Sequence, residues 1–112
     1  MQRAGARQVS RFAKNARAGS IDLERLTYPH KGGLLQADIY IIAPGMVSEL
    51  IEHVGEELGY VLEGSLVLTL DEQTYTLQPG DSFSFPSNVP HGYRNTSNEV
   101  VRVLWVNTPA TF

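Results

Sequence analysis

From residue 21 onward, apolar and polar residues alternate over short stretches, and turn-forming residues separate these stretches. Leucines alternate with valine and threonine over 66–70, and serines alternate with phenylalanines over 82–85. A period of two is the pattern of half-buried β-strands, and Pro44-Gly45 and Pro79-Gly80 bound the stretches as turns do. The pattern predicts about nine short strands and no long helix. They include strands near residues 21–26, 34–43, 57–63, 65–70, 74–77, 83–85, 91–94 and 100–106.

Short strands at regular spacing are typical of an all-β sandwich or barrel, jelly rolls included. A length of 112 residues corresponds to a single domain. Residues 1–20 break the pattern, because their apolar positions form only a thin helical stripe, at Val9, Phe12, Ala13 and Ala16. We predict a basic tail or linker at 1–20, for which a solvated tail, a short helix and an added edge strand all remain open, and one β domain over 21–112.

The net charge of −3 is unevenly distributed, because residues 1–25 carry a balance of +4 and residues 26–112 a balance of −7. Nucleic-acid binding needs clustered cations, so this acidic body is not expected to contact nucleic acid directly. The lack of cysteine excludes a disulfide framework and Cys-ligated zinc. No stretch approaches the roughly 18 apolar residues of a membrane span, and the N-terminus has no apolar signal region. We therefore expect a cytoplasmic protein without a membrane partner.

Two stretches carry side chains of the kinds that bind metals, and glycine or proline turns bound both. The stretch 45–64 contains His53 and Glu57, and the stretch 80–95 contains His91. Two imidazoles and one carboxylate, if a fold brings them together, form the facial triad that suits non-haem iron and related metals. A regular strand aims residues four positions apart at one face, although Gly55 is able to distort such a strand.

The first of these stretches resembles the first sequence motif of the cupin superfamily, a group of small β-barrels of the jelly-roll type. The matching residues stand at the spacing of that motif and are Gly45, His53, Glu57 and Gly64. Ile51, whose side chain cannot bind a metal, occupies the position of the first histidine.

The second stretch resembles the second cupin motif. The matching residues are Gly80, Pro86, His91 and Asn95. Asn88 replaces a glycine, and this change is mild because Asn tolerates a left-handed backbone better than most residues. Together the two resemblances imply an all-β fold, a cupin-type jelly-roll β-barrel of one domain. Because this fold hosts enzymes, storage proteins and sensors alike, the fold alone does not give the function.

The resemblance also implies that His91, on a facing strand, completes a metal site with His53 and Glu57. The expected cofactor is one divalent metal ion, either Fe, Mn, Zn or Ni. Because Ile51 removes one ligand of four, weak metal binding and a polar pocket without metal both remain open. A third alternative is a hydrogen bond between Glu57 and His91 in a barrel that never binds a metal.

Further side chains are candidates for lining a cavity that holds a small organic ligand. They are Tyr40, Phe83, Phe85, Tyr93, Asn95 and Trp105. Aromatic residues on strands are also ordinary core residues, and this alternative stays open for the aromatic members. The run Tyr60-Val61-Leu62 is apolar on both faces, which indicates burial by another sheet or subunit and predicts a homodimer.

The run 55–64 and the ending 103–112 more narrowly resemble the C-terminal cupin domain of bacterial helix-turn-helix regulators of the XRE type. This resemblance implies a non-catalytic, ligand-sensing domain whose DNA-binding helices lie outside this chain. The chain is then either part of a regulator or a stand-alone relative. The alternative function is that of a small metal-dependent cupin enzyme, a dioxygenase, isomerase or lyase. We assign no catalytic residues, because no nucleophile arrangement or phosphate loop is recognisable.

Overall fold

The computed structural model describes residues 1–12 and 16–110, which contain eleven β-strands and no helix. The strands are β1 (Val9–Arg11), β2 (Ala16–Ala18), β3 (Ile21–Arg25), β4 (Gln36–Ile42), β5 (Val47–Ser48), β6 (Glu56–Glu63), β7 (Leu66–Leu70), β8 (Gln73–Leu77), β9 (Ser82–Pro86), β10 (His91–Arg94) and β11 (Val101–Thr108). The prediction of an all-β fold is confirmed.

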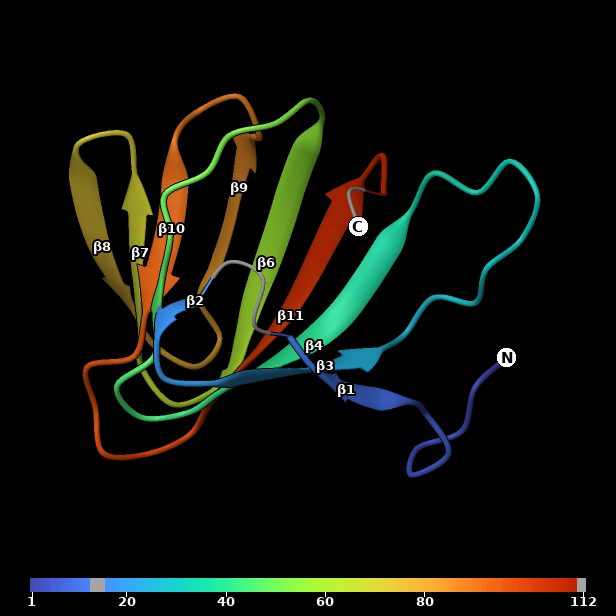
Figure 1. Ribbon diagram of the computed structural model, residues 1–112, viewed down its shortest axis with the longest axis horizontal. Coiled ribbons are helices and arrows are strands. Elements are labelled where there is room, and N and C mark those ends of the chain that lie inside the picture. Colours follow the sequence, from blue (N-terminus) through green and yellow to red (C-terminus); the bar gives the residue numbers. More distant parts are fainter. Residues whose placement is uncertain (13–15, 111–112) are drawn as a thin grey trace.

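The strands form two antiparallel sheets, which Figure 1 shows side by side. The six-stranded sheet has the order β1-β3-β4-β11-β6-β9, and the five-stranded sheet has the order β2-β5-β10-β7-β8. The chain therefore crosses between the sheets repeatedly, as it does from β9 to β10 and from β10 to β11. Such crossings are the hallmark of a jelly roll, and they bring residues distant in sequence to the same interior.

The central strand β11 shows how the sequence sets the inner face of the larger sheet. Its residues alternate between buried and half-buried positions along the whole strand, so Val101, Trp105 and Asn107 all face inward. Across the ladder to β4, Asp38 pairs with Trp105 and Gln36 pairs with Asn107. One end of the interior is therefore polar, while the rest is apolar. The apolar core comprises Ile21, Leu23, Tyr40, Ile42, Met46, Val61, Leu66, Leu68, Phe85, Val101, Val103 and Trp105.

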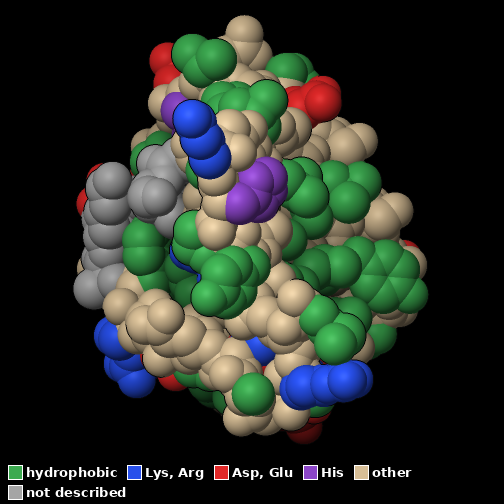
Figure 2. All heavy atoms as spheres, turned by 90° about the vertical axis from the view of Figure 1, so that its right-hand side faces the viewer, with side chains coloured by type: hydrophobic (Ala, Val, Ile, Leu, Met, Phe, Trp, Pro, Cys, Tyr) green, Lys and Arg blue, Asp and Glu red, His purple; other side chains and the backbone are tan. Residues whose placement is uncertain are grey.

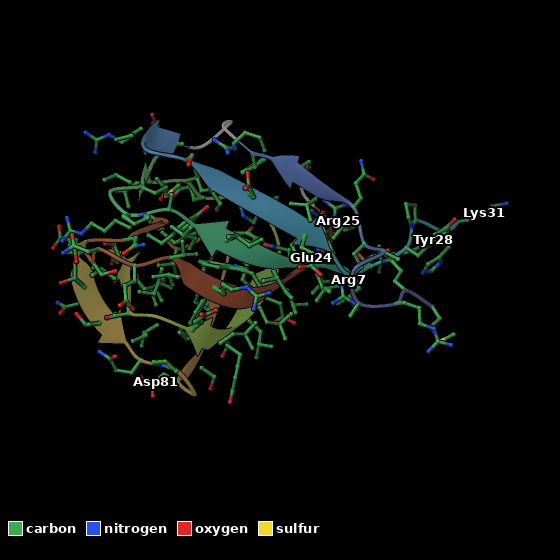
Figure 3. The ribbon with its side chains drawn as sticks, turned by 90° about the horizontal axis from the view of Figure 1, so that it is seen from below. Arg7, Glu24, Arg25, Tyr28, Lys31 and Asp81 are labelled. Atoms are coloured by element: carbon green, nitrogen blue, oxygen red, sulfur yellow. The ribbon has the colours of Figure 1, made fainter. Side chains whose placement is uncertain are left out.

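An ion pair between a buried carboxylate and a partly exposed arginine lies at the polar end of the interior. Asp38 is completely buried, and its Oδ1 lies 2.5 Å from Nε of Arg25 on β3. Burial raises the pKa of Asp38, and the contact with Arg25 offsets only part of that rise. A second pair joins Arg7 to Glu24 at 2.6 Å, and Figure 3 shows Arg7, Glu24 and Arg25 gathered near one end of β3.

Strands β1, β2 and β5 do not appear in the sequence pattern because they are short and their burial hardly alternates. All three residues of β1 are exposed, and β1 pairs with β3 through Val9–Arg11. Strand β2 pairs with β5 at the edge of the smaller sheet. Of the alternatives for residues 1–20, the described residues contain edge strands rather than a helix. Ala13 of the expected helical stripe lies outside the described residues.

The connection between β3 and β4 protrudes from the body at the right of Figure 1. Figure 2 views the molecule from that side and shows hydrophobic side chains scattered among polar and backbone atoms. Tyr28, Leu34 and Leu35 of this connection are each exposed by 60% or more.

Candidate metal centre

The three predicted metal ligands reach one place from separate segments of the barrel. Glu57 is the second residue of β6 in the larger sheet, and His91 is the first residue of β10 in the smaller sheet. His53 precedes β6, in the segment that connects it to β5. Among the described residues, these three form a group whose ligand atoms all lie within 4.8 Å of one another.

Backbone hydrogen bonds join the ligand-bearing segments directly. Ile51 and His91 exchange two such bonds of 2.9 Å each. The amide of His53 donates to the carbonyl of Ser87 at 2.9 Å, and the amide of Ser87 donates to the carbonyl of Gly55 at 2.8 Å. The relative positions of the ligands are thus fixed by the main chain and not only by side-chain packing.

Gly55 explains how His53 returns towards Glu57. Its φ of +115° lies in a region that residues with a Cβ rarely adopt, and a Cβ there would lie 2.3 Å from the carbonyl oxygen of Thr108. His53 therefore approaches Glu57 across a glycine bend and not along a regular strand.

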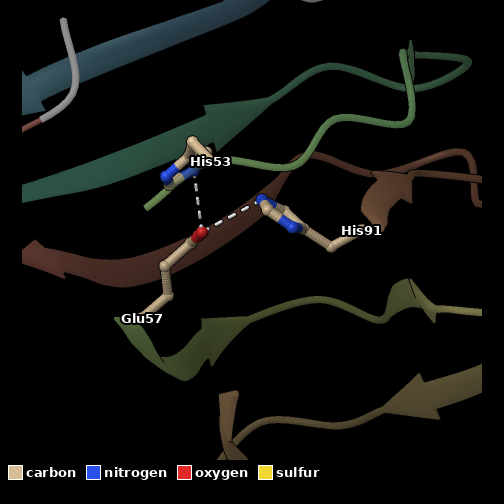
Figure 4. Close-up of side chains that lie close together, drawn as sticks. All are labelled: His53, Glu57 and His91. Carbon is tan, nitrogen blue, oxygen red and sulfur yellow. Dashed lines mark ion pairs between the residues drawn. The ribbon is translucent and has the colours of Figure 1, made fainter. Parts of the chain in front are cut away.

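One carboxylate oxygen is the centre of the group, as Figure 4 shows. Oε2 of Glu57 lies 3.0 Å from Nε2 of His53 and 3.0 Å from Nε2 of His91. The other oxygen, Oε1, accepts a hydrogen bond of 2.8 Å from Nε1 of Trp105. Glu57 and His91 are buried, whereas the side chain of His53 keeps 23% of its exposure, so the group opens to solvent on the His53 side.

Both histidines present the same nitrogen to the carboxylate. Nδ1 of His91 lies 2.8 Å from the carbonyl of Val89, and Nδ1 of His53 lies 3.1 Å from the carbonyl of Val54. Because a carbonyl only accepts, Nδ1 carries the proton, and a neutral ring then turns its Nε2 lone pair towards Glu57. Oε2 of Glu57 completes no hydrogen bond with the described residues. Converging lone pairs of this kind repel one another unless a proton or a cation lies between them.

The donor types fit a divalent metal, and so do the two distances from Oε2 of Glu57 to the histidines. Donor atoms at about 2.1 Å from one ion and at right angles are about 3.0 Å apart, which matches both contacts of Oε2. Imidazole nitrogens held by carbonyls on their far side are the usual form in which histidine binds a metal. Two imidazoles and one carboxylate leave further positions on an octahedral ion open for a ligand.

The protonation of the metal-free group follows from the same contacts. Burial lowers the pKa of His91, but the contact with Glu57 and the carbonyl of Val89 outweigh it, so the pKa is raised overall. Burial also raises the pKa of Glu57, but the contacts with His91, Trp105 and Ser87 outweigh it, so the pKa is lowered overall. Without a metal, a proton on His91 therefore stabilises the carboxylate that a metal would otherwise neutralise.

The aromatic candidates for ligand binding cluster around Trp105. The rings of Tyr40, Phe83 and Tyr93 all lie with centroids 4.8 to 5.0 Å from that of Trp105. The ring of Phe85 lies 4.8 Å from that of His91. The structure thus brings these rings next to the metal-ligand group, and it also makes most of them part of the hydrophobic core.

Asn95 is not brought to this group. Its Nδ2 donates to the carbonyls of Ile42 and Glu99, and its Oδ1 accepts from the amide and hydroxyl of Ser97. These four bonds use its full hydrogen-bonding capacity in holding the turn that follows β10.

Sequence reasoning missed several polar residues of the interior, and Ser87 and Asp38 are two of them. Ser87 contacts Glu57 from the turn after β9, and Asp38 is the buried acid of β4. Asp38 gives a weak signal, because it stands at a buried position within an apolar strand sequence. Ser87 gives none, since a serine between a proline and an asparagine is an ordinary turn residue.

The fold and the site together define a cupin. The cupin domain family matches residues 38–107, and this chain belongs to that family. The HTH-type transcriptional regulator PuuR of Escherichia coli is 44% identical over 70 residues, which cover 62% of this chain and 38% of PuuR. The chain thus spans less than half the length of this relative. None of the described residues forms a helix that could cross a membrane.

Solved structures agree with this assignment. The cupin domain of an XRE family transcriptional regulator from Enterobacter cloacae matches with a TM-score of 0.73 and 26% identity, covering 81% of this chain and 98% of that one. The predicted resemblance to the cupin domains of such regulators is confirmed. A predicted oxalate decarboxylase from Thermotoga maritima matches with a TM-score of 0.83 and 21% identity, covering 96% and 97% of the two chains. At this identity the match demonstrates a shared fold alone.

Proposed function

We propose that this chain is the small-molecule-sensing domain of a bacterial, cytoplasmic transcriptional regulator, and that it holds a divalent metal at His53, Glu57 and His91. The observation that carries the proposal is the convergence of these three side chains in a chain that is 44% identical over 70 residues to a regulator. In this function the domain binds a ligand without changing it, and a separate helix-turn-helix domain contacts the DNA.

A metal held by His53, Glu57 and His91 would give the ligand an attachment point. When bound, it supplies a Lewis-acid centre that attracts an oxygen or nitrogen donor. His53 and His91 contribute neutral nitrogens, and Glu57 contributes the negative charge that offsets part of the charge of the ion. Trp105 holds the second oxygen of Glu57 at 2.8 Å, so a single oxygen of this carboxylate is directed at the histidines.

A small organic ligand of the metal would contact the neighbouring aromatic rings. Phe85 lies beside His91, so we expect its ring to contact a molecule on the open side of the group, whereas Trp105 is only 1% exposed and acts through its hydrogen bond to Glu57. Flat rings near a few polar atoms are the usual lining of small-molecule sites. Binding then alters a DNA-binding partner domain only to the extent that the ligand favours one domain arrangement over another.

The sensing function also requires a defined assembly, for which we propose a homodimer formed through the outer face of β6. Leu58, Tyr60 and Leu62 are exposed by 48%, 43% and 40%, and they stand in a row on that face. A pocket of about 450 Å³ lies beside this row, between Leu58 and residues of β9 and β11. An apolar strip with an adjoining hollow is the kind of surface that a second copy covers.

The dimer is tested by light scattering on the purified chain. Tyr60→Glu should convert the dimer to a 12.4 kDa monomer, since it places a charge in the apolar strip. Tyr75→Glu is the matched control, because Tyr75 is exposed by 47% on β8 of the other sheet. A wild type that is monomeric at micromolar concentration, or equal effects of the two changes, would refute the assignment of this surface.

The metal is tested by native mass spectrometry of wild type, His91→Ala and His30→Ala. The wild type should carry one divalent metal per chain and lose it on His91→Ala. His30→Ala should retain it, because His30 is exposed on the β3–β4 connection and lies outside the group. Stoichiometric metal in His91→Ala would show that the ion is bound elsewhere.

The sensing function is separated from an enzymatic one by following the fate of the ligand. The open positions of a three-ligand centre favour a metal-dependent enzyme as the second candidate. Amines, amino acids and small carboxylic acids are screened by thermal shift with iron, manganese, zinc or nickel, and each stabilising compound is recovered and analysed. Compounds recovered unchanged support sensing, whereas conversion at enzymatic rates would make the chain an enzyme.

A further inference from the structure

Ser87 is a completely buried residue whose hydroxyl completes no hydrogen bond with the described residues. Most buried polar side chains in proteins are paired, so an unpaired one is an exception with a cause. Ser87 directly follows β9, and an alanine there would fit the same space without leaving a polar atom unpaired.

The main chain of Ser87 holds it against the metal-ligand group. Its carbonyl accepts the 2.9 Å bond from His53, and its amide donates the 2.8 Å bond to Gly55. Its side chain faces Glu57 closely enough to help lower the pKa of that carboxyl group. The buried hydroxyl of Ser87 therefore lies close to the carboxylate of Glu57, whose Oε2 faces both histidines at 3.0 Å.

A small reorientation of the carboxylate would pair these two groups. Trp105 already holds Oε1, so Glu57 can turn only about that contact. A bound metal would draw Oε2 into a defined direction, while the hydroxyl of Ser87 rotates freely and keeps a proton to donate. A carboxylate that binds a metal is commonly held in place by such outer hydrogen bonds.

We propose that Ser87 is a positioning residue of the metal centre, whose hydroxyl donates a hydrogen bond to Glu57 when the metal is bound. The proposal rests on the metal site of the proposed function. Ser87 does not bind the metal itself; it fixes the carboxylate between Trp105 and the two histidines. Its buried hydroxyl is unpaired in the metal-free state and becomes paired in the metal-bound state.

Ser87→Ala should affect the metal affinity and the stability of the metal-free fold differently. Ser87→Ala removes a hydroxyl that is unpaired without metal, so the metal-free variant should be as stable as the wild type or more stable. The same change should weaken metal binding about 10-fold to 100-fold, the usual effect of losing an outer hydrogen bond. A residue with a purely structural role would show the opposite, with a less stable metal-free fold and an unchanged affinity once folded.

The experiment uses the full chain freed of metal by a chelator. Zn²⁺ affinity is measured by competition with a chromophoric chelator, and stability is measured by urea denaturation without metal. The visible absorption spectrum of bound Co²⁺ reports the ligand geometry. Ser84→Ala is the matched control, because Ser84 is exposed on the outer face of β9, three residues before Ser87.

We expect Ser87→Ala to bind Zn²⁺ more weakly, to alter the Co²⁺ spectrum and to keep its metal-free urea midpoint, while Ser84→Ala matches the wild type in all three. Equal Zn²⁺ affinities of Ser87→Ala and wild type, or a lowered metal-free midpoint, would overturn the positioning role while leaving the metal site intact. A wild type that binds none of these ions would instead overturn the metal site, and the role of Ser87 with it.

Discussion

Trp105→Phe removes one buried hydrogen bond while keeping an aromatic ring in the core. The indole donates to Oε1 of Glu57 at 2.8 Å, and the two residues are only 1% and 5% exposed. A hydrogen bond to a charged group is worth about 1.5–3 kcal/mol, and the smaller ring leaves a cavity that costs about 1 kcal/mol more. Trp105→Phe should therefore lower the free energy of unfolding by about 2.5–4 kcal/mol at neutral pH.

The assay is urea denaturation of the metal-free chain followed by far-UV circular dichroism, because Trp105 is the only tryptophan and its fluorescence is lost in the variant. A double-mutant cycle with Glu57→Met, which removes both acceptor oxygens, separates the hydrogen bond from the cavity, since the cavity term is the same with either residue at position 57. A coupling energy below about 0.5 kcal/mol would refute the reasoning, because the cost would then come from packing alone.

Two further predictions concern the same region. The pKa of Glu57 is lowered from 4.5, so its stabilisation is present above pH 4.5 and is lost as the pH falls through its folded-state pKa. The pKa of His91 is raised from 6.5, so its stabilisation is complete below pH 6.5 and is lost as the pH rises through its folded-state pKa. The stability difference between metal-free wild type and His91→Gln should thus be largest between pH 4.5 and 6.5, and a flat difference in urea titrations would contradict this. Gly55→Ala should cost roughly 3 kcal/mol or more, because it combines a φ of +115° with a 2.3 Å clash against the backbone. Gly45→Ala, with a φ of +82° and open space around its Cβ, measures the backbone cost alone, so equal losses of thermal stability in the two variants would rule out the clash.

The sequence predicts those parts of the fold in which burial alternates. Strands such as β7 and β11 carry alternating apolar residues because one of their faces meets the core, so they appear in the pattern at nearly their observed bounds. Strands β1 and β2 are held at sheet edges by backbone bonds, with side chains that are mostly exposed, and such pairing leaves no trace in hydrophobicity.

For the site, the resemblance of the two stretches to the cupin motifs predicts which side chains converge. His53, Glu57 and His91 do lie together, although the approach of His53 depends on the unusual φ of Gly55, which spacing cannot give. The environment of the group is set by contacts between residues far apart in sequence, such as the hydrogen bond between Trp105 and Glu57. The pairing state of Ser87 is likewise a property of packing, and no local pattern encodes it.

The main chain of Ile51 holds its loop in place, whereas its side chain decides whether a further metal-binding group stands beside His91. Its main chain exchanges two hydrogen bonds with His91, and opposite residues in such a pair project their side chains to the same face. The side chain can therefore be exchanged while the main chain continues to hold the loop in register. A single substitution by histidine would add a donor next to His91, and the reverse substitution would remove it, at little cost to the fold. The number of candidate metal ligands can therefore change by one while the main-chain pairing is kept, which leaves one scaffold open to both recognition and catalysis.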